Sequence, residues 1–359
     1  MDFEIKDSKK EKKKTQKQKE KKLIILAVFF LLLSITLVII YLLIGNNAKN
    51  KQQPSAPKVT KEPVVEKIKI VDQDSNERPI AIMIDNNIGS ALHAGLQDSY
   101  LNYEAIVEGG LTRIMALYKD KNVSLIGPVR SSRHYFLDYA LESDAIYTHY
   151  GWSTYAANDI KALRVKNING LTDEQPFWRE SSAKAPHNVF TSTDKIRNYL
   201  SQKSYSATSN NWQLLNYKVD EVSLSELPNA TPATKISIDY SYYQNRSYNY
   251  DSENKYYLRS MNGSAHLDKT SNSQLHYKNL IIEKVNNVTL DSEGRQDLAT
   301  VGTGTGYYIT NGYSLPINWT KSSRSAKTKY IYNDGTEINV NDGNTFIQIV
   351  PTTSNIVIE

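Results

Sequence analysis

Cysteine is absent from this chain of 359 residues. Its absence excludes disulfide bonds, thiolate metal sites, a cysteine nucleophile and the attachment of a lipid to a cysteine side chain. An exported chain without disulfides is more typical of the envelope of a bacterium with a single membrane than of a eukaryotic secretory pathway. Any stability outside the cell must therefore come from packing, hydrogen bonds and ion pairs.

Surplus charge is absent from most of the chain. The first 22 residues hold ten lysines and five acidic residues, which leaves 33 basic and 33 acidic residues, out of 43 and 38, for the remainder. The sequence pI of about 8.9 therefore arises from the N-terminal tail. A neutral remainder has no basic footprint for a nucleic acid, so we expect no nucleic-acid partner.

Motifs of known catalytic and cofactor sites are also missing. No Ser-His-Asp, His-rich metal-binding or paired-carboxylate pattern occurs at a recognised spacing, so the sequence predicts no metal site and identifies no cofactor. Residues 302–306 (GTGTG) resemble a phosphate-binding loop, but the lysine of such loops is missing and a β hairpin is expected to follow instead of a helix. Whether the protein is an enzyme stays open.

One long apolar run follows the basic tail of residues 1–22. Residues 23–44 form an uncharged run of 22 residues, and about 20 are enough to cross a bilayer as a helix. A cleaved signal peptide is the alternative, but its apolar part is usually only about 7 to 15 residues long and ends at small residues. We predict a single retained transmembrane helix in the cell membrane, with the N-terminus in the cytoplasm and the later domains outside. Residues 45–77 are polar and contain several prolines, which is typical of a spacer.

Strand and helix signals alternate between residues 78 and 228, and this alternation predicts an extracytoplasmic α/β domain. The expected strands cover residues 80–85, 114–118, 123–129 and 145–150. The expected helices cover residues 97–107, 154–163 and 192–200, with one more helix after residues 130–133 that has a serine at its N-cap.

The composition changes at residues 228–232 (PNATP). Beyond this point the chain is rich in tyrosine, asparagine, serine and threonine, and Asn-Gly and Asp-Gly pairs separate short alternating runs. We therefore predict a mostly antiparallel β domain over residues 229–359. Proline on both sides of the boundary disfavours a continuing element, so we expect the two domains to fold as separate units.

Three arginines lie where the predicted strands and helices end. Arg113, Arg130 and Arg133 could present planar donors to a phosphate or a carboxylate. Ser131 and Ser132 lie between two of them at the predicted start of a helix, where unpaired N–H groups and the helix dipole favour an anion. The sequence thus predicts an anion site here.

The alternative is that these arginines pair internally and only stabilise the fold. The acidic residues that could take this role are Glu104, Glu108 and Asp138.

Asp85, His149 and His187 complete the set of candidate ligand-binding residues. Asp85 ends a predicted strand, where a carboxylate can face an α/β crevice or cap the following turn. The two histidines could act as acid/base groups, or they could be hydrogen-bonded structural residues. No partner in the sequence decides between these readings.

Several longer segments resemble one known family. They are residues 78–86 (RPIAIMIDN), 103–118 (YEAIVEGGLTRIMALY), 126–136 (IGPVRSSRHYF), 144–151 (DAIYTHYG), 185–188 (APHN), 294–312 (GRQDLATVGTGTGYYITNG), 317–325 (INWTKSSRS) and 343–351 (GNTFIQIVP). The chain resembles the YerB-like envelope proteins of Gram-positive bacteria, a two-part family of unknown function whose members are usually lipoproteins. Here a transmembrane helix replaces the lipidated cysteine, and residues 88–93 lack the family's Arg-Pro-Gln. The resemblance implies a compartment outside the membrane and implies no activity.

Two functions from different classes fit these observations. The first is a binding module for an anionic or glycan envelope ligand, such as an anionic polymer or a lipid headgroup, or for a partner protein. The second is a phosphotransferase or hydrolase acting on wall polymers carried on lipid pyrophosphate, because the order of features resembles the layout of LytR-CpsA-Psr proteins. No diagnostic motif of those enzymes matches residue by residue, and likeness of layout alone says little about function.

Overall fold

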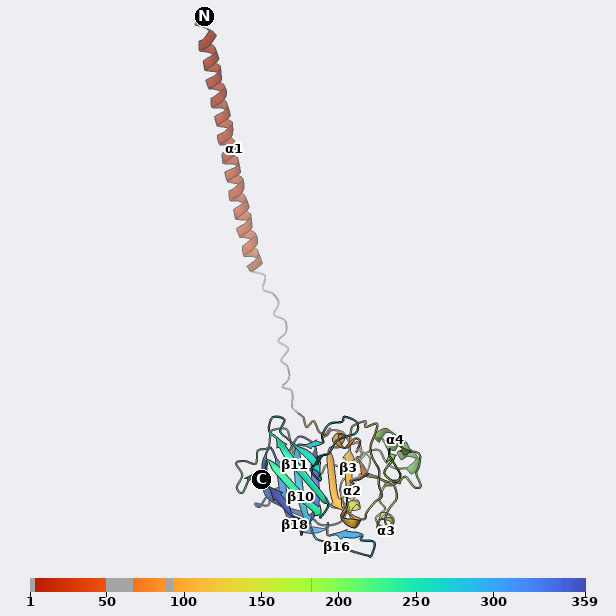
Figure 1. Ribbon diagram of the computed structural model, residues 1–359. Coiled ribbons are helices and arrows are strands. Elements are labelled where there is room, and N and C mark those ends of the chain that lie inside the picture. The colour runs from red at the N-terminus through yellow and green to blue at the C-terminus, as the bar shows by residue number, and fades with distance from the viewer. Residues whose placement is uncertain (1–3, 50–66, 88–92, 182) are drawn as a thin grey trace. The chain divides into compact units, whose positions relative to one another are not determined.

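The computed structural model describes residues 4–49, 67–87, 93–181 and 183–359. The chain divides into two compact units, Met1–Val65 and Glu66–Glu359 (Figure 1).

The first unit contains one long helix, α1 (Glu4–Lys49, 46 residues). Its stretch Lys13–Ile44 is long enough and apolar enough to cross a membrane. The most apolar part of this stretch is not buried against the rest of the protein. Large side chains such as Leu23 and Phe30 are 72% and 58% exposed. Water is an unfavourable surrounding for so much apolar surface. The expected helix is present, and its insertion into a membrane stays a prediction.

The second unit is built on an 11-stranded mixed sheet. Its strands, in spatial order, are β20 (Lys329–Ile331), β19 (Tyr313–Lys321), β18 (Gly302–Thr310), β15 (Asn279–Val285), β22 (Thr345–Pro351), β2 (Leu101–Ile106), β3 (Thr112–Tyr118), β1 (Ile80–Asp85), β4 (Ile146–His149) and β5 (Asn167–Asn169), with β9 (Thr231–Pro232) paired to β19. Strands β1, β2, β3 and β22 are buried at every residue. Continuous burial explains why their sequences read as apolar runs without alternation.

A second sheet of six strands is antiparallel. It contains β13 (Ser264–Ala265), β12 (Tyr256–Met261), β11 (Gln244–Asp251), β10 (Lys235–Ser241) and β23 (Ile356–Ile358), with β14 (His276–Tyr277) paired to β12. In β10, buried residues alternate with more exposed ones, which is the pattern of a strand with one face on a core. Three two-stranded ladders complete the strands: β16 (Asn287–Thr289) with β17 (Gln296–Leu298), β8 (Tyr217–Lys218) with β21 (Val340–Asn341), and β6 (Trp178–Arg179) with β7 (Val189–Phe190).

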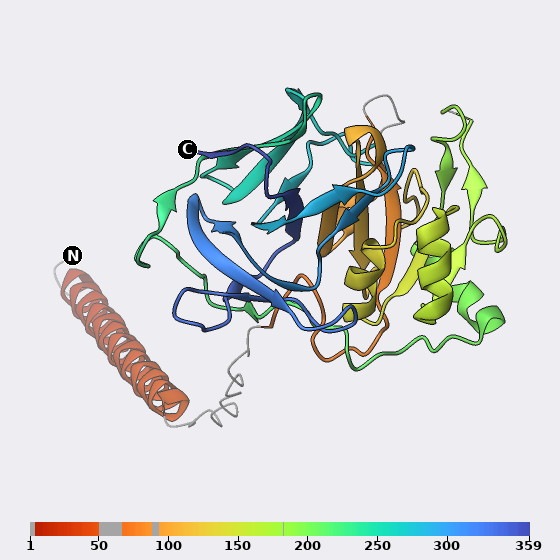
Figure 2. The same ribbon diagram turned by 90° about the horizontal axis from the view of Figure 1, so that it is seen from below.

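Short helices accompany the strands of the first half of this unit. They are α2 (Phe136–Glu142), α3 (Thr154–Ala162) and α4 (Thr193–Tyr199), with the 3-10 turns η1 (Leu96–Asp98), η2 (Glu108–Gly110) and η3 (Leu200–Lys203). In Figure 2, α2 and α3 lie side by side next to the orange strands of the main sheet. Ser153 and Ser192 cap α3 and α4 by accepting hydrogen bonds from backbone N–H groups, as short polar side chains do at helix starts.

The predicted fold class is confirmed: a long apolar N-terminal helix is followed by a mixed α/β part and a largely antiparallel β part. Two expected elements are wrong. Residues 97–107, expected to be helical, form η1 and then β2, because β2 pairs with β22 from the far end of the chain. Residues 123–129 make only isolated bridges, to Ala94, Thr191 and Ile84.

The expectation that the two halves fold as separate units also needs correction. Strand β22, near the C-terminus, lies between β15 of the second half and β2 of the first half, and it is parallel to both. The main sheet therefore crosses the boundary at residues 228–232, and the whole of Glu66–Glu359 forms one compact unit. The change in composition marks a change of strand pattern and not a change of sheet.

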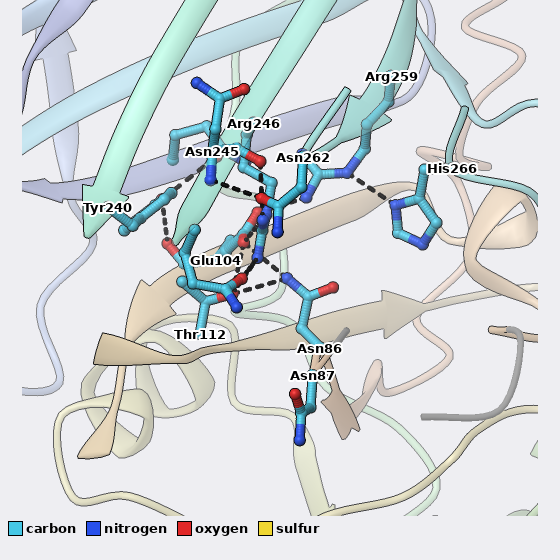
Figure 3. Close-up of polar contacts among 12 residues, drawn as sticks. Asn86, Asn87, Glu104, Thr112, Tyr240, Asn245, Arg246, Arg259, Asn262 and His266 are labelled. Atoms are coloured by element: carbon cyan, nitrogen blue, oxygen red, sulfur yellow. Dashed lines mark hydrogen bonds and ion pairs between the residues drawn. The ribbon is translucent and has the colours of Figure 1, made fainter. Parts of the chain in front are cut away.

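One buried carboxylate links the two sheets. Glu104, in the middle of β2, is completely buried and forms ion pairs with Arg246 of β11 (Nε to Oε1, 2.7 Å) and Arg259 of β12 (Nη2 to Oε2, 2.6 Å). Asn86 and Thr112 also donate hydrogen bonds to Oε1, at 2.6 and 2.7 Å. Figure 3 shows these groups converging on Glu104 from both sheets.

The charge of Glu104 is held by these neighbours. Burial alone would raise the pKa of this carboxyl, but Arg246 and Arg259 outweigh burial and hold the pKa at about 2. Isolated charges in a protein interior are very unfavourable, so the three charged groups depend on one another.

We predict that Glu104→Gln lowers the free energy of unfolding by about 3 to 5 kcal/mol, because it leaves two buried guanidinium groups without their counter-charge. All four tryptophans lie beyond residue 66, so their fluorescence during urea unfolding of the detergent-solubilised chain reports this unit. The matched control is Glu221→Gln, which removes a pair with Lys255 whose two side chains are each 50% exposed; its effect should be small.

The buried charge of Glu104 also predicts that the stability depends on pH. The folded pKa of Glu104, about 2, lies below the value of 4.5 for a free side chain. Its contribution is therefore complete above about pH 4.5 and is lost as the pH falls toward 2. Equal acid sensitivity of the wild type and Glu104→Gln would contradict this assignment.

Candidate functional site

Three chain segments meet at the C-terminal end of β1. The backbone N–H of Asp85 donates to the carbonyl of Pro128 at 2.8 Å, and the N–H of Arg130 donates to the carbonyl of Met83 at 2.9 Å. On the other side, the N–H of Val129 donates to the carbonyl of Val189 at 2.7 Å. These bonds place the side chains of residues 85, 130 and 187 together, although they are far apart in sequence.

We call the group Asp85, Arg130 and His187 the Asp85 site. The Asp85 carboxylate is only 5% exposed; its Oδ2 lies 3.4 Å from Nε of Arg130 and accepts a hydrogen bond from Nδ1 of His187. Its Oδ1 accepts from the backbone N–H of Asn87 at 3.2 Å. The side chains of Arg130 and His187 are 21% and 25% exposed, so both can be reached from solvent.

Arg179 extends this site with a second guanidinium group. Its Nη1 donates to Oδ1 of Asn188 at 2.6 Å, and its Nη2 approaches the hydroxyl of Tyr150 at 3.4 Å. Asn188 follows His187 in sequence, and the N–H of Tyr150 donates to the carbonyl of Arg130. Arg179 therefore contacts the segment that carries His187 directly and the segment that carries Arg130 only through Tyr150, and it is exposed.

The two other predicted arginines are engaged inside the protein. Arg133 forms two parallel contacts with Glu108, one of them Nη2 to Oε2 at 2.8 Å, and donates to the carbonyl of Ser132 at 2.7 Å. Arg113 is buried and donates to the carbonyl of Ser131 at 2.5 Å. Burial, together with the nearby arginines, lowers the pKa of Arg113 to about 10. The alternative that the arginines pair internally and stabilise the fold therefore holds for Arg133, which pairs with Glu108.

The serines are not at a helix start. Helix α2 begins at Phe136, its N-cap residue is Tyr135, and no side chain caps it. Ser132 is buried, and its Oγ accepts a hydrogen bond from the Tyr147 hydroxyl at 2.8 Å. The expected serine N-cap is therefore wrong, because residues 131–133 run beside residues 151–153 as extended chain before α2 begins. Ser131 remains half-buried next to Arg130.

His149 is a structural residue in this fold. It is completely buried, with Nδ1 2.8 Å from the carbonyl of Gly151 and Nε2 3.2 Å from Oδ1 of Asn167. Burial lowers the pKa of His149 to about 4, so the ring is neutral near pH 7. It does not reach Asp85 and has no part in the Asp85 site.

The chemistry of the Asp85 site follows from its donors. Arg130 offers several N–H groups to a ligand, and the carboxylate of Asp85 supplies a fixed counter-charge beneath it. Because a carboxylate only accepts hydrogen bonds, Nδ1 of His187 donates to it and Nε2 is left to face a ligand. Among the described residues, no group of three or more His, Asp or Glu side chains could hold a metal ion.

These features define a class of protein: a chain with one long apolar N-terminal helix and a mixed α/β and β unit carrying a partly open Asp-Arg-His site. Models of the N-terminal and C-terminal domains of DUF3048, a protein family of unknown function, match residues 68–206 and 236–347. The chain belongs to this family, and the resemblance inferred from its motifs is confirmed.

One relative gives both a sequence and a structural match. The Bacillus subtilis (strain 168) protein named "Putative lipoprotein YerB" is 28% identical over 289 residues, which are 79% of this chain and 84% of that protein. The crystal structure of YerB from Bacillus subtilis has a TM-score of 0.70 with this chain, at 28% identity, covering 80% of this chain and 96% of the solved one.

We predict that Arg130 and Arg133 differ in how much they contribute to the stability of the fold. Arg133→Ala should lower the free energy of unfolding by about 1.5 to 3 kcal/mol, because it removes charge-assisted bonds and leaves Glu108 half-buried without its partner. Arg130→Ala should lower it by less, about 1 kcal/mol, because the Nε–Oδ2 separation of 3.4 Å is long for a charge-assisted bond and His187 and the N–H of Asn87 still bond the Asp85 carboxylate. Urea unfolding of both variants checks this order. Equal losses would make Arg130 a structural partner of Asp85.

Proposed function

We propose that this protein is a membrane-anchored, extracytoplasmic protein of the cell envelope that binds an anionic group of an envelope ligand at the Asp85 site. The group is a phosphate or a carboxylate of a polymer or a lipid headgroup. The apolar length of α1 and the lysine-rich tail support an anchor with the N-terminus in the cytoplasm. The name of the Bacillus relative, which describes a lipoprotein, supports attachment to a membrane.

One observation carries the binding function: the guanidinium of Arg130 is incompletely paired. Its Nε is buried without a hydrogen bond among the described residues and lies 3.4 Å from Oδ2 of Asp85, while its Nη1 donates to the carbonyl of Pro186, also at 3.4 Å. Arg133, by contrast, makes three contacts. Buried polar groups are almost always satisfied in native proteins, so an exception points to a missing partner.

The neighbours of Arg130 favour an anion as that partner. Arg179 of β6 adds a second positive charge beside the segment that carries His187, and His187 adds a ring nitrogen. Two planar guanidinium groups recognise phosphate and carboxylate oxygens well because they donate in pairs. Asp85 reduces the net charge of the site, which favours a ligand that also makes neutral contacts over a free inorganic ion.

Binding can be measured by titrating the full chain, in a non-ionic detergent, with a short glycerol phosphate oligomer and with a short polyglucuronate. Arg130→Ala should weaken binding of the preferred anion at least tenfold, because losing a charge-assisted contact costs about 1.5 to 3 kcal/mol. Arg197→Ala is the matched control: its Nε is likewise buried without a hydrogen bond among the described residues, but its side chain, 20% exposed, pairs with Glu77 away from the site. Failure of both anions to bind, or equal loss in the two variants, would overturn the proposal.

A second candidate function is hydrolysis or transfer at a lipid-linked pyrophosphate, and the Asp85–His187 pair favours it. A carboxylate that orients a histidine through one ring nitrogen leaves the other to accept a proton. At this site Nε2 of His187 would take a proton from water, the resulting hydroxide would attack phosphorus, and the bridging P–O bond would break to release a phosphate carried by Arg130.

Release of inorganic phosphate from a polyprenyl pyrophosphate in detergent separates this candidate from binding alone. Hydrolysis requires that the wild type release phosphate and that His187→Gln reduce the rate by about 100-fold or more, the usual contribution of a general base. Binding without phosphate release would leave the site a binding site and reject catalysis on this substrate.

A further inference from the structure

A pocket separate from the Asp85 site lies among α2, α3, β17 and the loop after β19. It has a volume of about 440 Å³, within the range of sites for small ligands. It is lined by residues from α2 and the turn before it, from α3, from the turn after β16, from β17 and the turn after it, and from the loop after β19. None of these residues belongs to the Asp85 site.

The floor of this pocket is a fixed polar network. Arg324 donates from Nε to Oδ1 of Asp138 at 2.6 Å and from Nη1 to Oδ2 of Asp159 at 2.7 Å. The hydroxyl of Thr300 donates to Oδ2 of Asp138, also at 2.6 Å. These bonds join α2, α3 and the C-terminal half, so the floor is preorganised before any ligand arrives.

Above the floor, Asp297 offers free accepting capacity. Its Oδ1 lies 2.9 Å from Nε2 of His134, while its side chain is 48% exposed. A carboxylate has lone pairs for several hydrogen bonds, so one contact with His134 leaves room for hydroxyl donors from a ligand.

The rim of the pocket is apolar and open to solvent. Tyr155, Leu290 and Val301 are 36%, 37% and 42% exposed. The ring of Tyr155 lies 5.7 Å from that of His134, centroid to centroid. A tyrosine at the edge of a polar pocket offers an apolar face together with a polar end.

The charges of this pocket disfavour an anion. Asp138 and Asp297 of the lining, with Asp159 paired to Arg324, bring three carboxylates against one guanidinium, that of Arg324, and the imidazole of His134. A phosphate or carboxylate ligand would meet like charge here, and such mismatches are strongly unfavourable. The pocket therefore differs in kind from the Asp85 site.

We propose that this pocket binds an uncharged pyranose ring, one sugar unit of a glycan. A pyranose has an apolar C–H face, which suits Tyr155, Leu290 and Val301, and a girdle of hydroxyls, which suits Asp297. The site is independent of the Asp85 site, yet Arg130 and His134 are four residues apart, at most roughly 14 Å along an extended chain. A glycan that carries anionic groups could thus use both sites.

Saturation-transfer NMR of the full chain tests the proposal in a polyoxyethylene detergent, which contains no sugar. The probes are glucose, N-acetylglucosamine, mannose, galactose and rhamnose, each also as its methyl glycoside. Saturation should pass to ring protons of at least one of them. Tyr155→Ala should weaken its binding about three- to tenfold, and Asp297→Asn about tenfold.

Two controls make the result specific. Tyr242→Ala removes a completely exposed tyrosine at a hairpin tip and should leave sugar binding unchanged. Arg130→Ala should also leave it unchanged, which separates this pocket from the anion site. No transfer to any of the sugars, or transfer that neither Tyr155→Ala nor Asp297→Asn reduces, would overturn the proposal; so would transfer that Arg130→Ala abolishes.

Discussion

The buried charge of Glu104 is the constraint on which the rest of this unit depends. A carboxylate in the middle of a completely buried strand is tolerated only when opposite charges and hydrogen-bond donors surround it. Those partners, Arg246 and Arg259, come from the second sheet. The first and second halves of the chain must therefore assemble together, and the main sheet, with β22 inserted between β15 and β2, shows the same dependence.

This network also reaches the backbone of the Asp85 site. Arg259 donates from Nε to Nδ1 of His266 at 3.0 Å, Nε2 of His266 lies 2.7 Å from Nδ1 of His93, and Nε2 of His93 contacts the carbonyl of Asp85. Burial lowers the pKa of both histidines, which keeps the two imidazole rings neutral. Asn86, beside Asp85, bonds Glu104 directly. The end of β1 is therefore fixed on its inner side, and Asp85 presents its carboxylate to Arg130 from a rigid support.

The charged residues divide into two groups by how completely they are paired. Glu104, Arg246 and Arg259 are buried and saturated, and Arg133 is engaged by Glu108. Arg130 and Asp297 instead keep unused hydrogen-bonding capacity and partial exposure. Saturated groups stabilise a fold, whereas unsaturated ones at the surface are available to ligands. For this reason we propose ligands for Arg130 and Asp297.

Local sequence patterns predicted a substantial part of this architecture. The apolar run before Asp85, the strand at residues 114–118, the helices starting after Ser153 and Ser192 and the Asn-Gly hairpin at 311–312 are all present. Each of them depends on neighbours within a few residues. The α/β and β character of the two parts follows from the same signals.

The failures share a non-local cause. Residues 101–106 contain Glu104 in mid-strand, a poor strand former, and pairing with β3 on one side and with β22, more than 200 residues later, on the other makes this segment a strand. The sequence also offered Asp85, Arg130 and His187 as separate candidates, but their meeting depends on sheet order and on the loop before β7. The pocket around Asp297 could not be found in this way, because its lining comes from segments that are distant in sequence.

We propose that Arg130 and His187 hold an anionic group of an envelope component. The most direct test is mass spectrometry of the small molecules that remain bound to the full chain when it is extracted from bacterial membranes in non-ionic detergent. Our account predicts a phosphate- or carboxylate-bearing envelope component with the wild-type protein, and its loss from an Arg130→Ala, His187→Gln double variant that is still folded. The same component in equal amount on both proteins, or no anionic component on the wild type, would contradict it.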